Sequence, residues 1–259
     1  MNAFFDMLWI EMRKTLRSRM PLFTILGSLL MPLGISFLIF VSRNPDISRK
    51  LGLISTKASL MADTATSWPA YLNLFGQMIA AGGFFFFCLI LSWVFGREFS
   101  DGTLKDMLAV PVPRASILLA KFAVSAAWSV ALSLVIIALG LGMGALIGLP
   151  QGSAEVILQG LLRAIIVAGL TIVVVMPFAL FASIGRGYLL PVGVAILALI
   201  MANVVAIAGW GEYFPWAIPG LYSQPKSILP AASYWVVIFT GLAGIAATYL
   251  WWKLADQSR

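Results

Sequence analysis

The residues with the clearest chemical pattern lie between Arg97 and Arg114, where charged side chains surround a short apolar repeat. Four side chains in it are spaced i, i+3, i+4 and i+7, which places them on one face of a short helix. They are Leu104, Met107, Leu108 and Pro111. Asp101 is a candidate cap for this helix beside the flexible Gly102, and Pro111 and Pro113 end it. Such a face docks either on lipid or in a groove of a partner protein, and the spacing leaves both open.

A second set of polar residues lies within apolar stretches that are long enough to cross a membrane. The amides among them are Asn73, Gln77 and Asn203. Polar groups at such depths either hydrogen-bond between helices or line a pathway, and both interpretations stay open. No Asp or Glu falls at the centre of an apolar stretch, which argues against a carrier driven by protons or sodium ions. It also favours an apolar or amphipathic substrate.

Catalytic and metal chemistry have little support in the sequence. The chain has no histidine and one cysteine, Cys88, so the commonest metal ligand and general base are missing. We therefore predict no catalytic residue, no metal site and no cofactor in this chain. A phosphate-binding loop of the G-x-x-x-x-G-K-[ST] type, a G-x-S-x-G elbow and an H-E-x-x-H zinc site are also absent.

The composition indicates whether water or lipid surrounds most of the chain. Of the 259 residues, 61% are hydrophobic and only 10% are charged. Soluble domains are about 45–50% apolar and about 25% charged, so this chain has too little charge to cover a water-exposed surface. The net charge of +7 comes from basic residues beside apolar stretches, which is typical of membrane proteins and does not indicate nucleic-acid binding.

The apolar stretches predict an all-α polytopic membrane protein with one transmembrane domain over residues 1–259 and six transmembrane helices. We expect these at residues 20–42, 71–95, 117–147, 156–183, 189–210 and 234–252. An amphipathic helix over residues 3–19 precedes them. It either lies in the membrane interface or extends the first span, and its four basic residues favour the interface.

Two segments outside the spans have distinctive compositions. Residues 211–232 are rich in proline and aromatic residues, which predicts short pieces that re-enter the membrane or an ordinary interfacial loop. The polar stretch from Arg43 to Pro69 is expected to lie outside and to carry a short helix.

The distribution of Lys and Arg predicts the orientation. With the N-terminus inside, the cytoplasmic segments hold Arg13, Lys14, Arg17, Arg19, Arg97, Lys105, Arg114, Lys121, Arg186, Lys253 and Arg259. The external segments hold Arg43, Arg49, Lys50, Lys57 and Lys226, and Arg163 falls near the external end of the fourth span. This bias places both termini in the cytoplasm.

The run that follows the second span resembles that of type-2 ABC-transporter permeases. The matching residues are Glu98, Gly102-Thr103-Leu104, Met107-Leu108, Pro111-Val112-Pro113-Arg114 and Ile117-Leu118-Leu119-Ala120-Lys121. The family's typical run is an acidic residue, G-T-L, L-L, P-x-S/P-R and a Lys at the start of the third helix. The size and motif are most similar to the permeases of bacitracin and lantibiotic exporters.

The resemblance implies a multi-pass protein of the plasma membrane, the inner membrane in bacteria, that exports a peptide antibiotic, lipid or drug. Two copies of a separate ATP-binding subunit would bind the ATP and Mg. A second permease subunit, identical or related, would complete the pathway. Residues 97–114 would be the coupling segment, with Leu104, Met107 and Leu108 as the docking face. Glu98 and Arg114 would orient it, unless they serve only solubility and the retention of positive charge inside.

Three other classes of protein stay open from the residues alone. A stand-alone secondary carrier or channel is disfavoured by the missing central carboxylates. An intramembrane enzyme is disfavoured by the missing catalytic motifs, and a structural or sensory membrane subunit has no feature that supports it.

Overall fold

The structure, a computed structural model, describes residues 3–43, 67–224 and 228–254. All regular elements within these ranges are helical, and no strand occurs in them. The helices in chain order are α1 (Ala3–Arg17), α2 (Met20–Arg43), α5 (Trp68–Met78), α6 (Phe84–Ser100), α7 (Leu104–Ala109), α8 (Arg114–Leu146), α9 (Ala154–Val175), α10 (Phe178–Ile184), α11 (Leu189–Ile207), α12 (Ile218–Tyr222) and α13 (Ala231–Leu254). A π-helical turn, η1 (Ile79–Gly83), joins α5 to α6, and a 3₁₀ turn, η2 (Gly211–Tyr213), precedes α12.

Six helical stretches of the described chain are long and apolar enough to cross a membrane. They are Met20–Val41, Trp68–Ser100, Arg114–Leu146, Ala154–Ile184, Leu189–Ile207 and Ala231–Leu254. The predicted all-α polytopic architecture with six transmembrane helices is therefore confirmed.

The second and third spans are longer than the apolar pattern predicts. The second continues to Ser100 instead of ending at residue 95, and the third begins at Arg114 instead of residue 117. The helix continues past the apolar stretch because Arg97 and Glu98 are paired inside the bundle and need no loop to reach water. The segment between the two helices is consequently shorter than the predicted 97–114.

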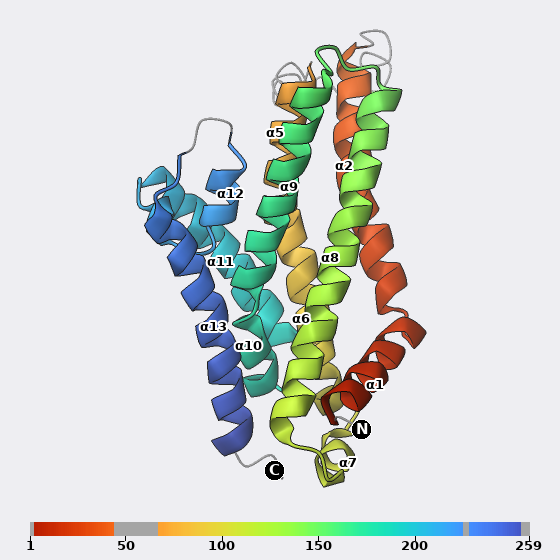
Figure 1. Cartoon of the computed structure of the whole chain (residues 1–259), viewed down its shortest axis with the longest axis vertical. Coiled ribbons are helices and arrows are strands. Elements are labelled where there is room, and N and C mark those ends of the chain that lie inside the picture. The colour runs from red at the N-terminus through yellow and green to blue at the C-terminus, as the bar shows by residue number, and fades with distance from the viewer. Residues whose placement is uncertain (1–2, 44–66, 225–227, 255–259) are drawn as a thin grey trace.

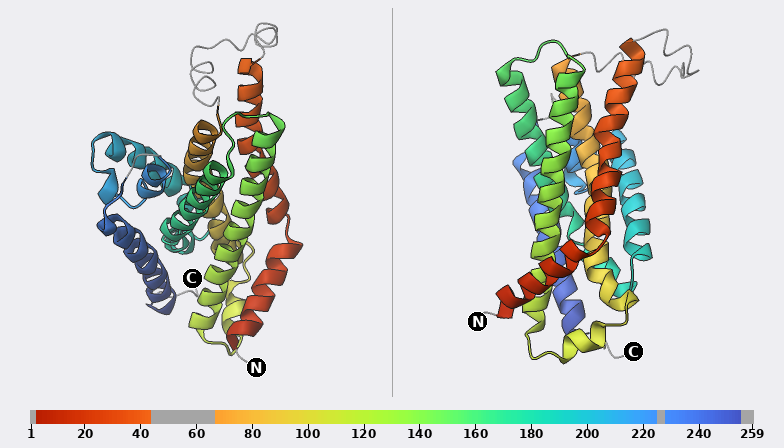
Figure 2. Two further views of the ribbon diagram at one scale, coloured as in Figure 1. Left: turned by 45° about the horizontal axis from the view of Figure 1, so that its top comes forward. Right: turned by 90° about the vertical axis from the view of Figure 1, so that its right-hand side faces the viewer.

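α1, α7 and the last turn of α13 lie together at one end of the bundle, which we call the termini end, opposite the far end (Figure 1). α1 lies obliquely across the bundle, whereas α2 runs along it (Figure 2). α8 contacts α1, α2 and α6, so it connects the oblique helix to the centre of the bundle.

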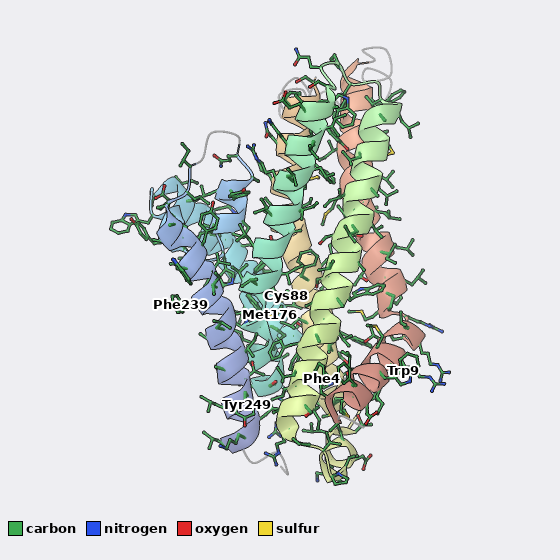
Figure 3. All side chains as sticks on the ribbon, in the orientation of Figure 1. Phe4, Trp9, Cys88, Met176, Phe239 and Tyr249 are labelled. Carbon is green, nitrogen blue, oxygen red and sulfur yellow. The ribbon has the colours of Figure 1, made fainter. Side chains whose placement is uncertain are left out.

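The opposite side of the molecule is built from α10 to α13. α10 packs on α6, α11 and α13, and α13 also packs on α9. Cys88 and Met176 lie inside the bundle, whereas Phe239 on α13 is 63% exposed and points outward (Figure 3). An outward ring of this kind is expected where lipid replaces water as the solvent.

The fourth span is interrupted at Pro177, between α9 and α10. Proline lacks the N–H that would continue the helical hydrogen-bond ladder, so α9 ends at Val175 and α10 begins at Phe178. Gly244 of α13 packs directly on this break, because a Cβ atom at that position would lie 2.5 Å from the backbone nitrogen of Pro177. The glycine therefore permits close contact between the sixth span and the interruption in the fourth.

The segment between the fifth and sixth spans turns back against the bundle. Trp216 donates from Nε1 to the backbone carbonyl of Val174 at 3.0 Å, and Ile218 is fully buried. Val174 lies well inside the fourth span, so this part of the predicted 211–232 segment packs beside a membrane-spanning helix. The short helix predicted between Arg43 and Pro69 falls mostly on residues 44–66, which lie outside the described residues.

Candidate functional site

The oblique helix α1 directs a charged residue into the protein. Its inward side consists of Met7, Glu11 and Thr15, all of which are buried. Part of its apolar stripe points the other way, since Phe5 is 61% and Trp9 is 68% exposed, and Trp9 lies on the outer side of the helix (Figure 3). An outward apolar stripe on a helix at the end of the bundle agrees with a position in the membrane interface.

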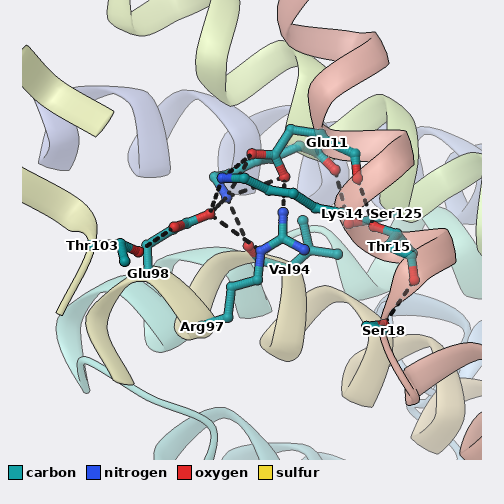
Figure 4. Close-up of polar contacts among 10 residues, drawn as sticks. Glu11, Lys14, Thr15, Ser18, Val94, Arg97, Glu98, Thr103 and Ser125 are labelled. Carbon is teal, nitrogen blue, oxygen red and sulfur yellow. Dashed lines mark hydrogen bonds and ion pairs between the residues drawn. The ribbon is translucent and has the colours of Figure 1, made fainter. Parts of the chain in front are cut away.

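Glu11 belongs to a group of five charged residues at the termini end, shown in Figure 4. We call this group the charge cluster, and its members are Glu11 and Lys14 of α1, Arg97 and Glu98 of α6, and Lys121 of α8. Glu11 and Lys121 are fully buried, Arg97 and Glu98 nearly so, and only Lys14 reaches the surface. Three helices that are distant in sequence therefore meet through ionised groups.

Lys121 is the central cation of the charge cluster. Its Nζ donates to Glu98 Oε1 at 3.1 Å, to Glu11 Oε2 at 3.3 Å and to the backbone carbonyl of Val94 at 2.9 Å. An ammonium group has three donors, and these three acceptors match that number. Lys121 thus has the partners that a buried cation requires.

Arg97 completes the inner part of the charge cluster. Its guanidinium pairs with Glu11 through Nη2 and with Glu98 through Nε at 3.2 Å, and it lies 4.6 Å from the ring centroid of Trp93. Lys14 closes the outer side with its Nζ 3.2 Å from Glu98 Oε1. Removing one partner from a buried ion pair typically costs roughly 3–5 kcal/mol, so the cluster behaves as a unit.

The charge cluster connects directly to the segment before α7. Thr103 donates from Oγ1 to Glu98 Oε2 at 2.8 Å, so the second carboxylate oxygen of Glu98 is used by the residue that precedes α7. Gly102 allows the turn between them because its φ is +70°, a conformation that costs other residues strain. Thr103 occupies the N-cap position of α7, whereas Asp101 occupies the C-cap position of α6. The predicted helix cap at Asp101 is therefore wrong.

The apolar side of α7 faces the protein itself. Leu104 is 7% exposed and Met107 is 9% exposed, and both join the buried core of the bundle. Leu104 and Met107 lie on one face as the spacing predicts, whereas Pro111 follows the helix and is exposed. The sequence could not tell whether this face binds a partner or the chain that carries it. On the outward side, Lys105, Asp106 and Val110 are exposed, and Leu108 lies on the same helix with its side chain outside the described part.

The other end of the segment is attached to the sixth span. Arg114 donates from Nη1 to the backbone carbonyl of Trp252 at 2.6 Å. Trp252 lies in the last turn of α13. A cation at this position complements the negative end of a helix dipole. Trp252 is fully buried and donates to the hydroxyl of Ser183 at 2.9 Å, which links the same turn to α10. Pro111, between the two attachments, is exposed.

Two of the three predicted polar residues share a cleft. Gln77 of α5 and Asn203 of α11 line a cleft of about 230 Å³ that is closed on one side by α12 and the residues just before it. Asn203 donates to the backbone carbonyl of Leu199 at 2.8 Å on its own helix. Asn73 lies about one turn away along α5 and lines a different cleft, where its Oδ1 is 3.4 Å from Arg163 Nη1.

Sequence reasoning missed most of the charge cluster. Of its members only Glu98 was predicted as a site residue, and Glu11, Lys14, Arg97 and Lys121 were not. One available signal was that Glu11 lies between Met7 and Thr15 at i, i+4, i+8, on the side of α1 away from its apolar stripe. The described residues contain no group of three or more His, Cys, Asp or Glu that could hold a metal ion.

The similarity of this chain to known proteins extends over the residues of this site. The family model described as "ABC-2 family transporter protein" matches residues 7–203, which include the charge cluster and α7. The chain is also 27% identical over 172 residues to a Bacillus licheniformis protein named "Bacitracin transport permease protein BCRB", covering 65% of this chain and 82% of the relative. No solved structure matches the chain.

Proposed function

The chain belongs to the ABC-2 transporter family and is an ABC transporter permease subunit, and we propose that it works in an ATP-driven exporter. The membership confirms the resemblance drawn from the residues between Glu98 and Lys121. In the proposed exporter, two copies of a separate ATP-binding subunit bind ATP and Mg, and this chain pairs with a second permease subunit. The second permease subunit is either identical to this chain or related to it, and an experiment that tests whether the chain forms a dimer with itself would decide between the two.

The observation that carries the proposal is the attachment of α7 at both of its ends. Before α7, Thr103 is hydrogen-bonded to Glu98 of the charge cluster. After it, Arg114 is hydrogen-bonded to the last turn of α13. A partner that displaces α7 would therefore act on α1, α6 and α8 through one end and on α13 through the other. This arrangement suits a segment that transmits force from an ATP-binding subunit.

The docking surface follows from which side of α7 is exposed. Because Leu104 and Met107 are used within the bundle, we assign the contact with the ATP-binding subunit to the outward side, with Lys105, Asp106 and Val110. The buried pair would then keep α7 seated against the bundle while the outward side binds. Pro111 lies exposed at the C-terminal end of this surface.

This function requires the termini end to be cytoplasmic. The distribution of Lys and Arg supports that orientation, because α1, α7 and the last turn of α13 all lie at this end and carry Arg13, Arg17, Lys105 and Lys253. The protein would then be a multi-pass protein of the plasma membrane with both termini inside.

The cleft shared by Gln77 and Asn203 is the proposed position of the pathway. Three exposed amides line it, those of Gln77, Asn203 and Gln224, among mainly apolar residues. Within the described spans the only carboxylates, Glu98 and Glu155, lie near span ends. Such a lining suits a hydrophobic or amphipathic substrate that forms hydrogen bonds without carrying buried charge. The name of the relative, a bacitracin transport permease, supports a peptide antibiotic as the substrate class.

Co-purification with an ATP-binding subunit tests the proposal. The chain is co-expressed with phosphate-loop ATPases sought in the neighbouring reading frames, and the amount of ATPase retained on the tagged chain is measured. Lys105→Glu and Val110→Asp should each lower retention roughly tenfold or more, the size of effect expected at an interface hot spot. Both residues are exposed, so the thermal unfolding temperature should not change.

Lys253→Glu is the matched control, since Lys253 is exposed at the same end but lies on α13. It should retain the ATPase as the unchanged chain does. Retention of the ATPase at full level by both α7 variants would show that docking does not use this surface. Failure of the unchanged chain to retain any ATPase would contradict the exporter itself.

A further inference from the structure

Arg163 is a cation placed within an apolar stretch of a membrane-spanning helix. It is the tenth residue of the span Ala154–Ile184, and Leu161-Leu162 and Ala164-Ile165-Ile166-Val167 flank it on the two sides. A span of 31 residues is roughly 46 Å long, compared with a hydrocarbon core of about 30 Å. If the excess is shared by both ends, Arg163 begins just inside the hydrocarbon and its long side chain reaches the headgroups of that leaflet.

Among the described residues, no partner of Arg163 neutralises its charge. Its Nη1 lies 3.4 Å from the amide oxygen of Asn73, and none of the ion pairs formed among the described residues includes it. The nearest acid along α9, Glu155, is two turns away and accepts a hydrogen bond from Gln159 at 3.2 Å. Arginine has five donors, so most of its hydrogen-bonding capacity remains available.

The space beside Arg163 is sufficient for a small ionised group. A cleft of about 250 Å³ opens between the far-end turns of α5 and α9, lined by Asn73, Gln159, Gly160 and Arg163 among others. The two helices approach closely there, because a Cβ atom at Gly160 would lie 2.4 Å from Leu72 Cδ1. The amides of Asn73 and Gln159 add polar groups to the charge of Arg163.

The outward side of α9 beside the cleft is apolar and open to lipid. Leu158 is 56% exposed and Leu162 is 52% exposed, and Ile166 continues the same outward side of α9. A soluble anion would have to approach through this apolar surrounding, whereas the headgroup of a lipid is already at the right depth. Guanidinium groups bind phosphate through paired hydrogen bonds that a neutral amide cannot replace.

We propose that Arg163 and Asn73 form a binding site for the phosphate group of a lipid in the far-end leaflet, with the lipid chains lying along the exposed apolar side of α9. Asn73 Oδ1 accepts from Arg163 and orients the guanidinium, and the amide NH₂ of Asn73 supplies a further donor. The site requires no ATP-binding subunit and stands independently of the exporter assignment.

Lipid binding to the purified chain in neutral detergent tests this site. Affinity is measured by native mass spectrometry for phosphatidylglycerol and for diacylglycerol, which has the same chains without the phosphate. The unchanged chain should bind phosphatidylglycerol in preference to diacylglycerol. Arg163→Gln should weaken phosphatidylglycerol binding roughly tenfold or more, as expected for the loss of a charge-assisted hydrogen bond, and Arg163→Lys should weaken it less.

Arg17→Gln is the control, because Arg17 is an exposed arginine of α1 at the other end. It should bind phosphatidylglycerol as the unchanged chain does. If Arg163→Gln folds poorly, Asn73→Asp offers a second route, since the new carboxylate would pair with Arg163 and should abolish the preference for phosphatidylglycerol.

Two outcomes would overturn the proposal. One is a folded Arg163→Gln or Asn73→Asp variant that binds phosphatidylglycerol with unchanged affinity. The other is inorganic phosphate that raises the unfolding temperature of the chain as much as phosphatidylglycerol does, because the site would then select the free ion and not a lipid.

Discussion

At the termini end of the bundle, five charged side chains from α1, α6 and α8 form ion pairs with one another, whereas at the far end Arg163 has a single amide partner among the described residues. Arg163 and three residues of the charge cluster lie on helices long enough to span a membrane. The other two residues of the cluster, Glu11 and Lys14, lie on α1 beside these helices. The difference indicates two uses of charge. Mutually paired charges hold helices together, and a cation without a carboxylate partner keeps its binding capacity for a group outside the chain.

Among the substitutions that test this comparison, replacement of Lys121 should have the largest effect on stability. Lys121→Met removes the one fully buried cation that the two carboxylates, Glu11 and Glu98, share and leaves them with Arg97 and Lys14, so the free energy of unfolding should fall by roughly 3–5 kcal/mol. Thermal unfolding in neutral detergent measures the loss. Ser125→Ala, one turn further along α8, should change stability by less than about 1 kcal/mol, because the Ser125 hydroxyl bonds only to its own helix.

A second substitution sharpens the interpretation of the Lys121 result. Because Glu11 and Lys121 are coupled, Glu11→Gln combined with Lys121→Met should destabilise the chain by less than the sum of the two single changes. Strict additivity would mean that the charge cluster does not act as a unit.

Gly102→Ala should have an intermediate effect, since it tests how the charge cluster is attached to α7. The positive φ of Gly102 costs an alanine roughly 1 kcal/mol, although no atom lies within 4 Å of the added methyl group. Gly142→Ala in α8 is the matched control: its surroundings are equally open but its backbone is helical, so it should be neutral or slightly stabilising. Equal unfolding temperatures for the two variants would show that the turn adapts without strain.

Arg163→Gln should have the smallest effect on stability. The substitution removes one positive charge, as Lys121→Met does, but no ion pair is lost, so the free energy of unfolding in neutral detergent should change by less than about 0.5 kcal/mol. A loss as large as that of Lys121→Met would erase the contrast between the two ends, because Arg163 would then also be a structural charge.

Much of the architecture is predictable because membrane spans can be recognised from the local composition of the sequence. The six spans follow from apolar length alone, and the helix around Leu104 and Met107 follows from its spacing. The ends of the second and third spans were misplaced because Arg97 and Glu98 were treated as residues that need water. Their helix continues because Glu11, 86 positions away from Arg97 in the sequence, neutralises part of the charge.

The parts that escaped prediction depend on contacts between distant segments. No local pattern shows that Glu11 pairs with Lys121, or that the apolar side of α7 is covered by its own bundle. The same holds for the amides, since Gln77 and Asn203 prove to share a cleft while Asn73, one turn from Gln77, faces Arg163. Residue type marked all three as unusual in a membrane span, but their partners decide what each of them does.

The π-helical turn at Ile79–Gly83 lets the second span hold one residue more than a regular helix with the same rotation between its two parts. A π turn contains one residue more than an α turn, so deleting Ala81 would restore regular helical winding and leave α5 at its present rotation relative to α6. If the same residues wound as a regular α-helix without the deletion, α5 would rotate by roughly 100° relative to α6. That rotation would carry Gln77 away from Asn203, so the extra residue of the π turn determines which side chains line the cleft, while Arg97 and Glu98 keep their place in the charge cluster.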